Sequence, residues 1–74
     1  MRATAVNRAI ERRGGVLARQ VGSHRRYSVT YIDADGTERT AHTTVPQHAG
    51  DIPVGTLRSI EKDLESAYGK GWLR

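Results

Sequence analysis

The sequence predicts a small α+β domain in which two helices cover one face of a three-stranded antiparallel sheet. Apolar residues follow helical spacing near both ends of the chain, and β-branched and aromatic residues alternate with polar ones between them. An Asp-Ala-Asp-Gly turn divides this middle region. Elements segregated in this way pack as a two-layer sandwich. The 74 residues are expected to form a single domain, 1–74, with a thin core, because a chain of this size buries only about 60% of its unfolded surface.

The first helix is expected from Thr4 to Arg13. Three apolar residues share one of its faces at helical spacing, namely Val6, Ala9 and Ile10. Thr4 is the candidate N-cap, because its hydroxyl can accept a hydrogen bond from a backbone N–H that the first turn leaves free. The glycine pair at 14–15 is expected to end the helix.

Three strands are expected in the middle of the chain, over residues 16–21, 26–32 and 37–45. In the second strand, tyrosine and valine alternate with serine and threonine, which is typical of a half-buried strand. Residues 33–36 have the composition of a hairpin turn. Pro46 cannot donate a hydrogen bond to the sheet, so the third strand should end there.

The second helix is expected to begin at Val54 or Thr56, with Thr56 as a candidate cap, and to run to Tyr68. Its apolar stripe is Leu57, Ile60, Leu64, Ala67 and Tyr68. The acidic residues of this helix are interpreted as a solvated face rather than as catalytic acids: Glu61, Asp63 and Glu65. Two placements remain open for Trp72 and Leu73, which either fold back onto the core or form an exposed interaction patch.

Positive charge is concentrated at the start of the chain. Residues 1–26 carry seven arginines and one glutamate, whereas residues 27–74 carry five basic and seven acidic residues. This pattern favours a polyanionic partner, and the alternative is a solvated basic helix face. The chain has no cysteine, no signal-peptide pattern and no apolar run near the ~20 residues of a membrane span, so a cytoplasmic protein without a membrane partner is expected.

The stretch Gly22-Ser23-His24-Arg25-Arg26 combines a proton-transfer group with phosphate-binding groups. Histidine titrates near neutral pH, and the small residues before it leave the imidazole uncrowded. Arg25 and Arg26, together with Arg19, are suited to neutralising a phosphate. Cleavage of an RNA backbone needs groups of both kinds. The alternative interpretation of His24 is a surface histidine, without a catalytic role, that ends a strand.

The other two histidines carry weaker signals. His42 is expected to share a strand face with threonines, as a cross-strand neighbour rather than a catalyst. For His48 two interpretations remain open, because it either lies near the active site or hydrogen-bonds its own loop. A zinc site built from all three histidines would need spacings of 18 and 6 residues, which fit no recognised ligand pattern, so no metal or other cofactor is expected.

Three ordered segments carry a resemblance to a known family: Gly22-Ser23-His24, Val45-Pro46-Gln47-His48 and Gly55-Thr56-Leu57-Arg58-Ser59-Ile60. With the predicted order of elements, they resemble the HicA toxins of bacterial type II toxin–antitoxin systems. The resemblance covers roughly residues 5–68. It implies a fold like that of the double-stranded-RNA-binding domain and an mRNA interferase activity, which is metal-independent RNA cleavage with His24 as the single catalytic histidine.

The resemblance also implies partners. These are mRNA and a HicB-type antitoxin that covers the His24 loop and inhibits the toxin, with the toxin monomeric alone and part of a larger assembly when bound. The candidate RNA-binding residues are Ser23, Arg25, Arg26, Arg19, His48 and Arg12. Two alternatives share the same fold and charge: a non-catalytic RNA-binding module, and a protein-interaction domain whose basic face meets an acidic partner.

Overall fold

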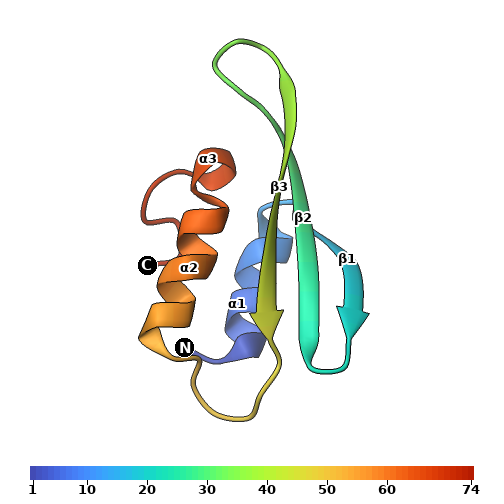
Figure 1. The fold of residues 1–74 in the computed structure, drawn as a ribbon. Coiled ribbons are helices and arrows are strands. Elements are labelled where there is room, and N and C mark those ends of the chain that lie inside the picture. The colour runs from blue at the N-terminus through green and yellow to red at the C-terminus, as the bar shows by residue number, and fades with distance from the viewer.

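The computed structural model describes residues 1–74 and contains helices at both ends of the chain and strands between them (Figure 1). The elements in chain order are α1 (Ala3–Arg12), β1 (Val16–Val21), β2 (His24–Ile32), β3 (Glu38–Pro46), α2 (Val54–Asp63) and α3 (Glu65–Tyr68). The strands form one antiparallel sheet in the order β1-β2-β3. The predicted α+β class is confirmed, and the order of elements is consistent with a double-stranded-RNA-binding-domain-like fold.

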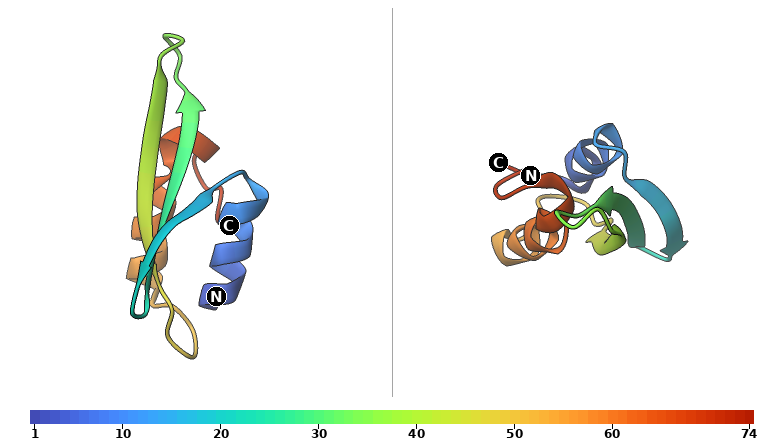
Figure 2. Two further views of the ribbon diagram at one scale, coloured as in Figure 1. Left: turned by 90° about the vertical axis from the view of Figure 1, so that its right-hand side faces the viewer. Right: turned by 90° about the horizontal axis from the view of Figure 1, so that it is seen from above.

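The helices lie against one face of the sheet and leave the other face open (Figure 2). Alternation along β2 explains this layering, since Tyr27 and Val29 are buried while Arg26 and Thr30 are exposed. The core between the layers consists of Ala3, Val6, Ile10, Tyr27, Val29, Val45, Ile52, Ile60, Leu64, Trp72 and Leu73. None of the helices is long and apolar enough to cross a membrane.

The start of α1 differs from the prediction. The N-cap position is Arg2, no side chain caps the helix, and Thr4 lies within the first turn. The reason is tertiary: Arg2 forms an antiparallel bridge with Asp51, and the carbonyl of Met1 accepts a hydrogen bond of 2.8 Å from Ile52 N–H. This pairing holds Arg2 in extended backbone, so the helix begins directly after it. The end of the helix, before the glycine pair, is as predicted to within one residue.

The second predicted helix is broken in two. Leu64 leaves helical geometry at φ −107° and ψ 10°, which separates α2 from α3. Thr56 lies inside α2, whose N-cap position is Pro53, so the earlier of the two predicted starts is the observed one. The break turns α3 so that the Tyr68 hydroxyl reaches α1, where it donates a hydrogen bond of 3.1 Å to the carbonyl of Ile10.

The C-terminal residues fold back onto the core, which confirms the first of the two placements for Trp72 and Leu73. Trp72 donates from its indole to the carbonyl of Glu61 at 2.8 Å, and Leu73 N–H donates to the carboxylate of Glu61 at 3.3 Å. Glu61 is therefore buried, with Arg74 paired to it at 3.3 Å, and the prediction that it belongs to a solvated face is wrong. The cause is the returning tail, which covers this side of α2.

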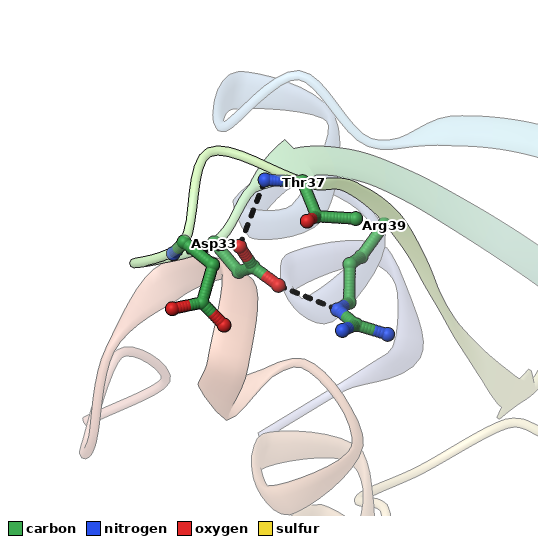
Figure 3. Close-up of polar contacts among 4 residues, drawn as sticks. Asp33, Thr37 and Arg39 are labelled. Carbon is green, nitrogen blue, oxygen red and sulfur yellow. Dashed lines mark hydrogen bonds and ion pairs between the residues drawn. The ribbon is translucent and has the colours of Figure 1, made fainter.

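The β2–β3 hairpin projects beyond the helices, and its tip is held together by one carboxylate (Figures 1 and 3). Asp33 accepts hydrogen bonds of 2.9 Å from the backbone N–H groups of Asp35 and Thr37. It also pairs with Arg39 at 2.6 Å. The arginine and these backbone bonds hold the pKa of the Asp33 carboxyl below its ordinary value.

The strands β2 and β3 are slightly shifted from the predicted ranges, since β2 begins at His24 and β3 ends at Pro46.

Candidate functional site

His24 is the first residue of the central strand, directly after the turn that joins β1 to β2. Gly22 in this turn has φ +56°, a left-handed conformation that residues with a Cβ rarely adopt. His24 then pairs with Val21 in β1 and with Pro46 in β3. The histidine therefore lies at one end of the sheet, and it is exposed.

The end of β3 brings a second histidine to the same place. The backbone N–H of Gln47 donates to the carbonyl of Ser23, which ties the residue after β3 to the turn before β2. His48 follows directly, and its ring lies edge-on to the ring of His24, with 6.4 Å between the centroids and 84° between the planes. Both histidines are exposed. Residues that are far apart in the sequence thus share one end of the sheet.

An amide pair fixes this end of the sheet to α1. The side chains of Gln47 and Asn7 exchange two hydrogen bonds, of 2.8 and 3.0 Å, and Gln47 also donates to the carbonyl of Val45 at 3.1 Å. Asn7 is buried, only 5% exposed. Neither amide is among the site residues predicted from the sequence. The available signal was Asn7 itself, a polar residue on the apolar face of α1 between Val6 and Ile10.

Two of the candidate arginines lie on the open face of the sheet with His24. Arg26 follows His24 at the strand spacing of two residues and therefore points to the same face. Arg19 in β1 is the direct cross-strand partner of Arg26. Arg26 also approaches the hydroxyl of Thr44 in β3 at 3.4 Å. Two cations placed opposite each other repel, so this pair is destabilising unless an anion lies between them.

Arg25 lies on the other face of the sheet. It is half-buried, and its guanidinium donates to Gln20 at 3.0 Å and to the hydroxyl of Tyr27 at 3.4 Å. The Tyr27 hydroxyl in turn donates to the carboxylate of Glu11 at 2.7 Å. Burial and this hydrogen bond to Glu11 raise the pKa of Tyr27 above its ordinary value. The adjacent arginines 25 and 26 are thus separated by the alternation of the strand.

Arg12 and His42 lie away from the histidine pair. Helix α1 begins beside the site and runs away from it, so Arg12 in its last turn lies roughly 14 Å further along the axis, at 1.5 Å per residue (Figure 1). His42 is exposed in the middle of β3, opposite Ser28. Ser23, the remaining predicted residue, is half-buried in the turn before His24.

A cavity of about 270 Å³ lies beside His48. It is formed where the loop after β3 meets the start of α1, and its lining residues are Arg2, Ala3, Thr4, Gln47, His48, Ala49 and Gly50. A larger cavity of about 330 Å³ lies elsewhere, between α2 and the C-terminal residues, and no histidine lines it. The smaller cavity is the one adjacent to the site, and Arg2 and His48 are the basic residues that line it.

The fold and the site define a small α+β protein that carries two neighbouring histidines and a basic face at one end of its sheet. Residues 4–65 match a family model described as the HicA toxin of bacterial toxin-antitoxin systems. The match covers most of the chain, so the protein belongs to the HicA toxin family and is a toxin of a toxin–antitoxin system, with an antitoxin as its partner. No curated protein and no solved structure matches the chain significantly.

Proposed function

We propose that this toxin is an endoribonuclease that cleaves mRNA in the cytoplasm without a metal ion, with His24 as its catalytic base. The observation that carries the proposal is the position of His24, which is exposed at the end of the central strand and shares a face with Arg26 and Arg19. His24 accepts the proton of a ribose 2′-OH, and the oxygen attacks the adjacent phosphorus. General base help of this kind contributes about 10²–10⁴-fold to the rate.

The arginines of the open face supply the charge that the reaction needs. Attack on the phosphate builds negative charge on its oxygens, and guanidinium groups placed beforehand lower the cost of that charge. Arg26 and Arg19 face each other across the strands, and a bound phosphate relieves their repulsion. We assign these two arginines to the phosphate, and Arg25, through its bonds to Gln20 and Tyr27, to holding the turn before His24.

The antitoxin partner fits the same surface. We propose a HicB-type antitoxin that covers the turn carrying His24 and presents acidic groups to Arg19 and Arg26. Covering this end of the sheet removes His24 from solvent and blocks the RNA at the same time. The proposal also includes a toxin that is a monomer when alone and a larger, inactive assembly when the antitoxin is bound.

The test compares the wild type with His24→Ala and with the control His42→Ala, which removes an exposed histidine elsewhere on the sheet. Each is expressed in cells while growth and the integrity of mRNA are followed, and each purified protein is tested on RNA in the presence of EDTA. The wild type and His42→Ala are expected to arrest growth and to cut RNA. His24→Ala is expected to keep its melting temperature and to lose cleavage by about 10²–10⁴-fold. Cleavage retained by His24→Ala would falsify the assignment.

A second candidate is a non-catalytic RNA-binding module, which the basic open face favours. Such a module needs the arginines but not the histidine. The two candidates separate in one comparison: a binding module would cut no RNA in any variant, and its affinity for RNA would be the same in wild type and His24→Ala. Loss of Arg26 would weaken RNA binding in either case. It would also reduce, by about one, the slope of the logarithm of the binding constant against the logarithm of the salt concentration.

A further inference from the structure

We infer that His48 is the general acid that completes the cleavage reaction, protonating the 5′-oxygen as it leaves the phosphorus. The inference rests on the proposed ribonuclease activity and adds a second catalytic residue to it. It starts from the spacing of the two rings, whose centroids are 6.4 Å apart. An imidazole must come within about 3 Å of the oxygen that it serves. Rings this close can therefore both reach oxygens of the same phosphate.

The relative placement of the rings favours two roles rather than one. His24 lies on β2, and His48 lies on the loop after β3, so the rings come from two separate segments. The angle between the planes of the two rings is 84°. The attacking and leaving oxygens lie on opposite sides of the phosphorus, so a base and an acid must approach from different directions. A phosphate held at this end of the sheet by Arg26 has an imidazole available from each segment.

The loop that carries His48 is anchored on both sides. Gln47, its immediate neighbour, donates from its backbone to Ser23, and its side chain is paired with the buried Asn7. These contacts hold the backbone at His48 close to the backbone at His24, because Ser23 directly precedes His24. On its other side His48 borders the cavity of about 270 Å³, which Arg2 also lines and which can receive the part of the RNA that leaves.

The step balances without any further reactant. Neutral His24 takes the 2′-OH proton, the new O2′–P bond forms, and the P–O5′ bond breaks with its electron pair on O5′. Protonated His48 gives its proton to O5′. The products are a 2′,3′-cyclic phosphate and a free 5′-hydroxyl, and exchange with water restores both histidines. The charged or titratable groups around His48 are His24, Arg2 and, three residues along, Asp51, which is paired with the N-terminal amine at 3.4 Å.

The experiment uses a leaving group that needs no acid. A cut site is first mapped on RNA with the wild type, and a short RNA carrying that site is made twice, once unmodified and once with sulfur replacing the bridging 5′-oxygen. Wild type, His48→Ala, His48→Gln, His24→Ala and the control His42→Ala are compared on both RNAs. Because both His48 variants lose an exposed side chain, melting temperatures close to that of the wild type are expected.

Each outcome decides the assignment. We expect both His48 variants to lose about 10²–10⁴-fold on the unmodified RNA and to recover to within about tenfold of the wild type on the sulfur-substituted RNA. His24→Ala should be impaired on both. Equal loss on both RNAs for the His48 variants, or no loss on either, would overturn the acid role of His48 while leaving the ribonuclease standing. If the wild type cuts no RNA at all, the proposed function itself fails.

Discussion

The two ends of the β2–β3 hairpin are held together by different kinds of contact. At the tip, all hydrogen-bond partners of the Asp33 carboxylate lie within six residues of it in the sequence, and Arg39 is the farthest. At the opposite end, the neighbouring histidines depend on Gln47, whose side chain bonds Asn7 from 40 residues away. One end of the hairpin is therefore local in sequence, whereas the other is also supported by a side-chain contact with α1.

This difference has a consequence for function. A local turn survives loosening of the core, because its hydrogen bonds need only a few neighbouring residues. The histidine end loses part of its support when α1 moves, because Asn7 and Gln47 then separate. The histidine end is thus expected to be the more sensitive of the two to changes in the core.

The largest effect is expected from breaking the amide pair. Asn7→Ala leaves the Gln47 side chain without its partner, at a cost of about 1–3 kcal/mol in unfolding free energy. Because the loop carrying His48 shifts with Gln47, RNA cleavage should fall by up to about 10²-fold even where the protein is fully folded. Urea unfolding and cleavage assays measure the two effects.

A double-mutant cycle sharpens this test. If the two amides act through each other, Asn7→Ala and Gln47→Ala combined should cost less than the sum of the single variants, with a coupling of about 0.5–3 kcal/mol. If the losses of unfolding free energy in the single variants simply add in the double variant, and RNA cleavage stays unchanged, the amide pair does not position the site.

A purely structural effect is expected at Gly15, away from both histidines. A Cβ at this position would overlap Ile10 Cγ2 and would lie 3.0 Å from the Tyr68 hydroxyl. Gly15→Ala should therefore cost about 1–3 kcal/mol of stability through overpacking. Cleavage per folded molecule should stay close to that of the wild type.

Gly55→Ala is the matched control for this variant. Gly55 lies within α2, and a Cβ there meets nothing within 4 Å, so the alanine should raise stability by about 0.4–1 kcal/mol. Thermal melts of the two variants should move in opposite directions. A stable Gly15→Ala protein would contradict the close packing at the end of α1.

The smallest effect is expected at the hairpin tip. Asp33→Asn removes the charge that pairs with Arg39, and the melting temperature should fall by less than it does in Gly15→Ala, with cleavage unchanged. Since the folded state lowers the pKa of Asp33, its stabilisation is fully present above the ordinary value of 3.8 and is lost as the pH falls through the lower folded-state pKa. Melts from pH 7 downward should show the variant and the wild type converging only at acidic pH.

Asp35→Asn provides the comparison within the same turn. Asp35 contributes its backbone N–H to the Asp33 carboxylate and not its own side chain, so this variant should melt like the wild type. Equal losses in the two variants would mean that net charge, rather than the Asp33 contacts, stabilises the tip.

Local physics made much of this molecule predictable from its sequence. The strand at Val16–Val21 has the predicted bounds, and the Asp-Ala-Asp-Gly turn and the glycines after α1 are where backbone preference puts them. The ordered motifs singled out His24, whereas for His48 they left a place near the active site as one of two interpretations. The strand and the turns depend on residues within a few positions of one another, and each motif is itself a short segment.

What the sequence determined by itself is the local part: the order of helices and strands, the tight turns, the basic start of the chain and the histidines. Tertiary structure alone decided the break at Leu64, the burial of Glu61 and the meeting of His24 with His48. The physical reason is distance along the chain. These features depend on contacts between separate segments of the chain, and no short stretch of sequence contains both partners.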